Sequence, residues 1–303
     1  SDEEEMADTY SMLIAQLHWE EHGDRQTAKE WLREPLDHDR KHEGAHRLLA
    51  EMAEADGEYK RAVQHLMVVS KVAGDGLDAL EIEQRLAQLL QTELGKPDAA
   101  ADRYKKVLEG APGDQRALEG LKTSQLTAGD WPGYLESLGH ELGLIVGRTD
   151  GLKVDQMTEL AADSVPDDSM VAASQILVDA AETAEHQIDE IEAAWKLYGA
   201  ALRMWPDNVD ALERRVELDR QLNRQRALAE DLEAFADCLL DADSRFGLLL
   251  DATEAWEQLG VKERALEVLE RAIEAGEEAD DGSDRLDQAR QRLDNSPQNE
   301  TTT

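Results

Sequence analysis

The chain has 303 residues, among them only two phenylalanines, and it is rich in alanine, leucine, glutamate and arginine. This composition is typical of helical proteins. Its 68 acidic residues outnumber the 32 basic ones and give a formal net charge of -36. Because this charge opposes contact with phosphate groups and anionic lipids, we expect neither nucleic-acid binding nor membrane binding.

The sequence contains no window that approaches 18 consecutive apolar residues, and the opening SDEEEMADTY lacks the basic-then-apolar pattern of a secretion signal. We therefore expect a cytoplasmic protein, and a fragment of a longer protein fits these observations as well. Cys238 is the only cysteine, which excludes an intrachain disulfide and a multi-cysteine metal site.

Apolar periodicity and turn residues predict helices that follow one another in pairs. In chain order, the seven predicted pairs cover residues 7–22 with 25–37, 43–56 with 59–73, 78–94 with 97–110, 115–128 with 131–147, 170–186 with 189–204, 208–222 with 225–241, and 244–259 with 262–276. Residues 148–168 are predicted to form an irregular insertion with one short helix over 152–164. A polar capping helix is expected at 284–294 and a disordered tail at 295–303.

The turns between paired helices recur at a nearly constant interval. The first four carry a glycine, at Gly23, Gly57, Gly95 and Gly129, with separations of 34, 38 and 34 residues. After the third of these turns, Ala100 stands at a position where two helices approach closely, Tyr104 follows on the same face, and Pro112 ends the helix. Ala194 and Tyr198 repeat this spacing in the second half of the chain.

These offsets resemble those of the tetratricopeptide repeat (TPR), a unit of two antiparallel helices about 34 residues long, in the degenerate form found in bacterial proteins. The resemblance implies an all-α fold, an α-solenoid of about seven antiparallel helix pairs spanning residues 1–294. It also leads us to predict a kink between residues 1–147 and 169–294, at the irregular insertion.

In TPR proteins the first helix of each pair generally lines the concave face and contacts an extended peptide or a partner helix. The resemblance places these candidate partner-binding residues here at Arg47, Glu51, Glu54, Arg85, Glu119, Thr123, Asp179, Thr183, His186, Glu213, Glu217, Glu254 and Glu257. Most are acidic, so we expect a protein or peptide partner with basic character. The alternative is that the acidity of this face only reflects the general excess of acidic residues.

The sequence contains few motifs that are typical of catalysis or of cofactor binding. The common phosphate-binding, dinucleotide-binding, serine-hydrolase and zinc-protease motifs do not occur, so we predict no catalytic residues and no cofactor. Six of the eight histidines lie in the first 65 residues, at His18, His22, His38, His42, His46 and His65. Two pairs have the i to i+4 spacing that places side chains on one helical face, but spacing alone fixes no ligand set, and we predict no metal site.

The leading hypothesis is therefore a noncatalytic scaffold that binds a basic protein or peptide in an acidic groove. The alternative hypothesis is a structural subunit, or an appended docking module, of a larger assembly. The sequence leaves the identity of the partner and the oligomeric state open.

Overall fold

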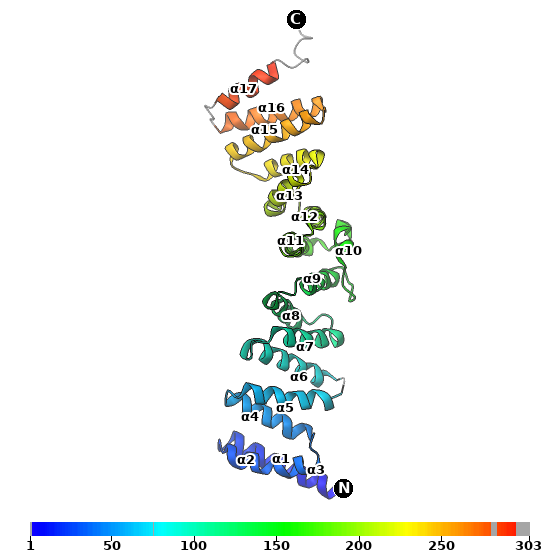
Figure 1. Cartoon of the computed structure of the whole chain (residues 1–303), viewed down its shortest axis with the longest axis vertical. Helices are drawn as coiled ribbons and strands as arrows, with labels where there is room; N and C mark the ends of the chain where they lie inside the picture. Colours follow the sequence, from blue (N-terminus) through cyan, green and yellow to red (C-terminus); the bar gives the residue numbers. More distant parts are fainter. Residues whose placement is uncertain (1, 75, 280–283, 295–303) are drawn as a thin grey trace. The chain divides into compact units, whose positions relative to one another are not determined.

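The computed structural model describes residues 2–74, 76–279 and 284–294, and within these ranges every regular element is a helix (Figure 1). The chain forms two compact units, Ser1–Ser137 and Leu138–Thr303. In both units, consecutive helices joined by short turns pack against each other, so each unit is an α-solenoid of TPR-like helix pairs, as the sequence predicts. The predicted tail at 295–303 lies outside the described residues.

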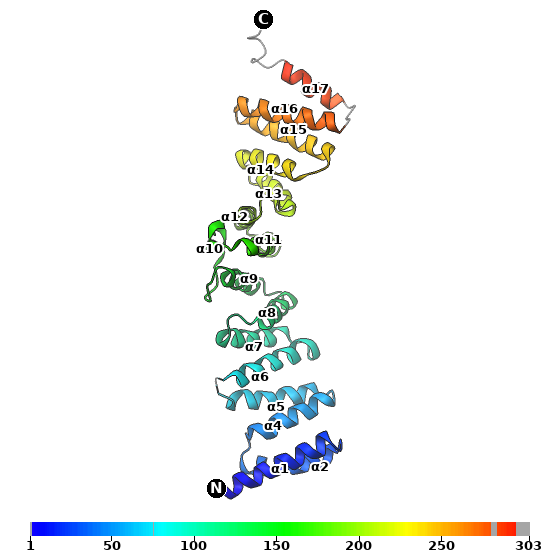
Figure 2. The ribbon, with the colours of Figure 1, turned by 180° about the vertical axis from the view of Figure 1, so that it is seen from behind.

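The first unit contains eight helices, a π-helical turn and the start of a ninth helix. They are α1 (Asp2–Glu20), α2 (Arg25–Trp31), α3 (Arg33–His38), α4 (Glu43–Ala55), α5 (Tyr59–Val72), α6 (Leu77–Gln88) with its π-helical turn (Leu89–Glu93), α7 (Pro97–Gly110), α8 (Gln115–Ala128) and α9 (Trp131–Ile145). Figure 2 shows the stacking of α4 to α8 from behind.

Two predicted boundaries in this unit are wrong. The first helix begins at Asp2 rather than at residue 7. The helix predicted over 25–37 is divided at Leu32 into α2 and α3. Pro35 explains the division, because it has no N–H to donate to the carbonyl of Trp31 and its ring would clash with that carbonyl in a continuous helix.

The second unit continues with a short helix and seven longer ones. They are α10 (Val154–Thr158), α11 (Met170–His186), α12 (Ile191–Met204), α13 (Val209–Gln221), α14 (Gln225–Cys238), α15 (Ala242–Gln258), α16 (Lys262–Glu278) and α17 (Asp284–Asp294). Two 3-10 turns, Ala162–Ser164 and Asp167–Ser169, separate α10 from α11. The predicted capping helix is confirmed, with Leu286 and Ala289 buried and its remaining outward positions polar.

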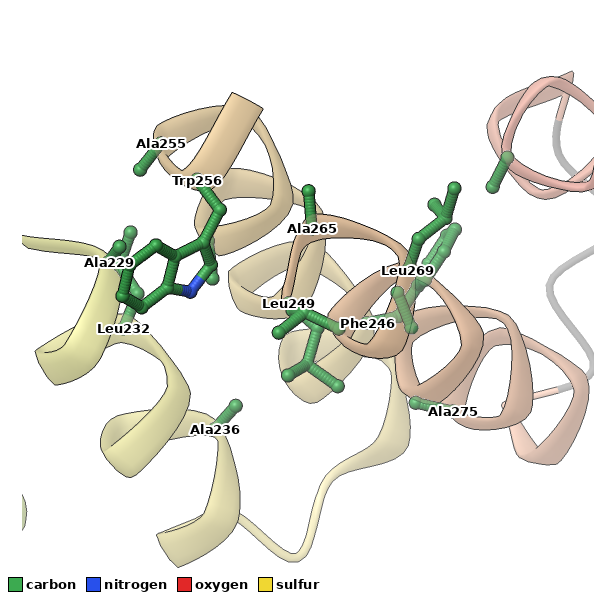
Figure 3. Packing of buried hydrophobic residues seen from close by; sticks show 14 of the residues in the cluster. Ala229, Leu232, Ala236, Phe246, Leu249, Ala255, Trp256, Ala265, Leu269 and Ala275 are labelled. Carbon is green, nitrogen blue, oxygen red and sulfur yellow. The ribbon is translucent and has the colours of Figure 1, made fainter. Parts of the chain in front are cut away.

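The core of each unit lies between consecutive helices. In the second unit, Trp256 of α15 lies against Ala229 and Leu232 of α14, while Phe246 and Leu269 fill the space between α15 and α16 (Figure 3). Fully buried alanines recur along these contact lines and allow the helix backbones to approach closely.

Ala100 and Tyr104 of α7 are both buried, as the spacing of the repeat predicts. The ring of Tyr104 on α7 covers Gly120 of α8, where an added Cβ would lie 2.3 Å from the ring. The Tyr104 hydroxyl donates to the side chain of Gln91 at 2.9 Å, thirteen residues earlier. Tyr198 makes the same kind of bond at the same separation, to Glu185 at 3.2 Å. The two tyrosines therefore occupy equivalent positions of the repeat.

The irregular insertion is confirmed, but its helix is much shorter than predicted, residues 154–158 rather than 152–164. Leu152 is not helical because its backbone lies against α9, where its N–H donates to the carbonyl of Gly139 at 2.8 Å. Gly151 approaches Gly143 one turn further along α9. Arg203 of α12 then donates to the carbonyl of Thr158 at 2.6 Å, at the end of α10. The predicted kink between 1–147 and 169–294 stays a prediction.

The contact between the insertion and α9 can be tested with Gly139→Ala. A Cβ at this position would lie 1.9 Å from the carbonyl oxygen of Leu152, so the insertion would have to move. We expect the free energy of unfolding, measured by urea titration, to fall by about 2–3 kcal/mol.

The matched control is Gly247→Ala in α15, where the nearest atom to an added Cβ is 3.8 Å away. This change should raise the free energy of unfolding by roughly 0.5–1 kcal/mol, because alanine is the better helix former. Equal effects of the two substitutions would contradict the close packing of the insertion.

Candidate partner-binding face

The thirteen residues predicted to contact a partner all lie on the first helices of the pairs. We call the exposed side of these helices the A-helix face. In the first unit it consists of α4, α6 and α8, and in the second unit of α11, α13, α15 and, at the end, α17. Glu119 and Thr123 of α8 and Glu213 of α13 are exposed on it.

In the first unit, one arginine lies within ion-pair distance of two carboxylates on the preceding first helix. Arg85 of α6 lies 2.8 Å from Glu54 and 4.0 Å from Glu51, both on α4. Arg47 pairs within α4, with Glu43 at 2.7 Å. The acidic residues predicted from the sequence on α4 are therefore partly offset by arginine.

The second unit repeats this arrangement on the helices that follow. Arg214 of α13 contacts Glu217 at 2.6 Å and also pairs with Glu185 of α11. Arg292 of α17 lies 2.7 Å from Glu257 and 4.0 Å from Glu254, both on α15. Each arginine thus lies between two carboxylates.

A further ion pair joins α13 to α15, with Arg220 and Asp251 3.0 Å apart. Arg214, Arg220 and Arg292 were not among the residues predicted from the sequence. The signal that points to them is a separation of about one repeat between arginine and carboxylate, 31 residues for Arg220 and Asp251 and 35 for Glu257 and Arg292.

The three predicted partner-binding residues on α11 differ in how exposed they are and in the hydrogen bonds that they already make. Thr183 is buried, and its hydroxyl donates to the carbonyl of Asp179 at 2.7 Å. The carboxylate of Asp179 accepts from the amide of Gln175 at 2.9 Å. His186 is exposed and lies 3.9 Å from Glu185. On this helix, the Thr183 side chain therefore lies within the packed interior, while His186 faces solvent.

A hollow of about 280 Å³ opens beside the Arg220–Asp251 pair. Leu228 and Leu232 of α14 are nearly buried beneath it, while Glu254 and Gln258 of α15 form part of its polar wall. The lining that the hollow exposes is mostly polar, and its carboxylates suit the charged end of a long basic side chain.

Two carboxyl groups of the second unit are buried close together. Asp219 of α13 accepts from the indole N–H of Trp195 at 2.6 Å, and Asp231 of α14 pairs with Arg215 at 2.9 Å. Burial raises the pKa of both groups, that of Asp231 to about 8, although Arg215 opposes the shift. Arg215 stabilises one negative charge, and burial disfavours a second one on the pair.

This pair makes the stability of the second unit depend on pH. A carboxyl group whose pKa is raised in the folded state contributes its full stability below the pKa of the unfolded chain and loses it as the pH rises toward the folded value. We expect Asp231→Asn, which keeps the hydrogen bonds without the charge, to stabilise the protein. Relative to the wild type, the gain in unfolding free energy should be on the order of 2 kcal/mol larger at pH 8 than at pH 5.

The matched control for urea titrations at these two pH values is Asp237→Asn, an exposed position of the same helix. It should leave the difference between pH 5 and pH 8 as in the wild type. An Asp231→Asn protein with the wild-type pH dependence would show that the buried pair does not retain a proton.

The N-terminal histidines take different roles. His18 of α1 and His22 in the turn that follows α1 have ring centroids 5.6 Å apart. His42 instead caps α4, where its Nδ1 accepts the N–H of Ala45 at 3.2 Å. The partner of His46 is therefore not His42 but His65 of α5, with the two Nδ1 atoms 2.9 Å apart.

Two histidines of the first unit have pKa values displaced in opposite directions. Burial lowers the pKa of His65, and the neighbouring His46 and Arg61 lower it further. The hydrogen bond to Asp8, 2.7 Å long, raises the pKa of His38.

We expect an NMR titration of the imidazole protons to give a midpoint for His65 below, and one for His38 above, the value of about 6.5 for an unperturbed histidine. Because the pKa of His65 is lowered by folding, its contribution to stability is present above pH 6.5 and is lost as the pH falls below it. Replacing Asp8 with asparagine should move the His38 midpoint down and leave that of His65 unchanged. Identical midpoints in the wild type would contradict both contacts.

Across the described ranges of the chain, no three His, Cys, Asp or Glu side chains gather in an arrangement that could hold a metal ion. None of the helices in these ranges combines the length and apolarity that a membrane span requires.

No protein-family model matches the sequence, and no curated protein is similar to it. Solved structures with a similar fold include a subunit of the Naa15/Naa10 complex bound to HypK-THB. It is 14% identical over 91% of this chain, with a TM-score of 0.49. This chain covers 39% of the length of that one.

A tetratricopeptide repeat protein from Parabacteroides merdae is 15% identical over 96% of this chain and all of its own length, with a TM-score of 0.38. The TPR domain of P58(IPK) is 16% identical over 94% of this chain and 77% of its own, with a TM-score of 0.32. Likeness at this level assigns no function to the chain.

Proposed function

We propose that this protein is a noncatalytic interaction scaffold whose A-helix face in the second unit binds an extended peptide or protein segment with basic residues. The observation that carries the proposal is the hollow between α13 and α15, whose mostly polar lining includes the carboxylate of Glu254 and the ion pair of Asp251 with Arg220. Glu213, Glu217 and Glu257 are exposed on the same helices.

The charges of this face favour a cationic partner even after the internal ion pairs are considered. Arg214 and Arg292 each lie between two carboxylates, so each group of three carries net negative charge. Glu213 adds a further exposed carboxylate on α13. A basic segment would therefore be attracted as it approaches this face.

The proposed absence of catalysis is supported by the kind of surface that the helices present. The hollow is open to solvent, whereas a small-molecule substrate is usually held in a pocket that buries most of its surface. Within the core, the buried Asp219 accepts a hydrogen bond from Trp195 and the buried Asp231 pairs with Arg215. They serve the packing of α13 against α14.

A charge-reversal variant tests the proposal. It replaces Glu213, Glu217, Glu254 and Glu257 with lysine, and its probe is a fluorescent extended peptide of alternating lysine and valine. We expect the affinity, measured by fluorescence anisotropy at 0.15 M salt, to fall by about tenfold or more, and wild-type binding to weaken as salt rises.

The matched control reverses four exposed glutamates of the second helices, Glu230, Glu263, Glu270 and Glu274. Both variants change the net charge by the same amount. If the two variants lose affinity equally, the attraction comes from the overall charge of the protein rather than from the A-helix face. That outcome would favour the alternative, a structural or docking module that makes no use of these carboxylates.

A further inference from the structure

The N-terminal helix α1 carries apolar side chains on two opposite faces. One face packs on the rest of the first unit, where Ala15 is fully buried and Met12 and Trp19 are partly buried. The other face exposes an apolar stripe of four large side chains, which we call the α1 stripe. Its members are Met6 (57% exposed), Tyr10 (65%), Leu13 (57%) and Leu17 (51%).

The spacing of the α1 stripe, i, i+4, i+7 and i+11, places all four side chains along one line of the helix. A helix at the surface of a protein normally has a single apolar face, and one with apolar residues on opposite sides is normally covered on both. The other terminal helix follows this rule, since α17 buries Leu286 and Ala289 and its exposed positions are polar. The α1 stripe therefore differs from the exposed side of α17 and is a candidate docking surface.

The charges around the α1 stripe indicate which kind of molecule fits. Glu3 and Glu20 are exposed at its two ends, and α1 contains no lysine or arginine. Beside Leu13, a hollow of about 830 Å³ lies between α1 and the segment that leads into α4. Glu5, Asp8 and Asp39 contribute carboxylates to its lining, and His38 is already paired with Asp8.

A second copy of the same chain fits this pattern poorly. If two α1 helices paired antiparallel along the stripe, Glu3 of one copy would lie beside Glu20 of the other. If they paired parallel, each glutamate would lie beside its own counterpart. Both arrangements place like charges together at the ends of the contact, which is unfavourable.

We propose that the α1 stripe binds an amphipathic α-helix of a partner protein, with basic residues on both sides of its apolar seam. Leucine-sized side chains of the partner would pack between Tyr10 and Leu13 and between Leu13 and Leu17. Its lysines or arginines would reach Glu3, Glu20 and the carboxylates of the hollow. This contact is separate from the A-helix face and does not depend on the function proposed for it.

The test uses the whole chain and a fluorescent helical peptide of leucine and lysine, with leucine at i, i+3, i+4 and i+7. An acidic twin carries glutamate at every lysine position. At 0.15 M salt we expect the basic peptide to bind at least tenfold more tightly than its twin. The double variant Leu13→Ser with Leu17→Ser should weaken binding of the basic peptide at least tenfold without changing the net charge.

Two matched controls distinguish binding at the α1 stripe from nonspecific hydrophobic binding and from attraction by the overall charge. Val171→Ser with Leu240→Ser removes two apolar side chains that are 56% and 97% exposed in the second unit, and it should change the affinity less than twofold. Glu3→Gln with Glu20→Gln should weaken binding two- to fourfold, whereas Glu263→Gln with Glu270→Gln should not. The charge reversal on the A-helix face should also leave this affinity within twofold.

Three results would overturn the proposal. The first is an equal loss of affinity in the variants of the α1 stripe and in the Val171 and Leu240 control. The second is a wild-type dimer in sedimentation velocity that Leu13→Ser with Leu17→Ser converts to monomer, because the occupant would then be a second copy. The third is a clear drop in the melting temperature of that variant, because the two leucines would then pack within the unit.

Discussion

The close packing of both units depends on small residues that face larger groups of the neighbouring element. Gly120 lies under the ring of Tyr104, Ala229 lies against Trp256, and Gly139 meets the backbone of Leu152. Inner helices of both kinds contact the helix before them and the helix after them, so first and second helices contribute to the core alike.

Buried carboxylates are a second organising feature of the fold. Glu83 of α6 accepts from Ser70 and Arg103, which lower its pKa against the opposing effect of burial. Glu233 of α14 accepts from the indole of Trp256 and from Arg264 and Arg271 of α16. Each of these two groups joins three helices, so a few acidic residues serve the interior, whereas most of those that the structure describes lie nearer the surface.

The fold was predictable because its determinants are local. The turn glycines, the alanine and tyrosine of each repeat and the apolar periodicity each act within one or two helices, so most helix bounds agree with the structure to within a few residues. Asp189 and Asn223 show why the repeat tolerates exceptions, because they adopt the left-handed conformation (φ 63° and 55°) that glycine has in turns such as the one at Gly129. The length of the helix at 154–158 was not predictable, since it depends on contact with α9. The ion pairs of the A-helix face join residues about one repeat apart, and the pattern of a single helix does not show which ones meet.

The arrangement of arginines between carboxylates on the first helices has a consequence for how such a surface changes over time. Losing Arg85 or Arg292 would release two glutamates of the preceding first helix at once. The strength with which this face attracts cations can therefore drift widely by substitution of a few basic positions, while every acidic residue and the packing beneath it stay as they are.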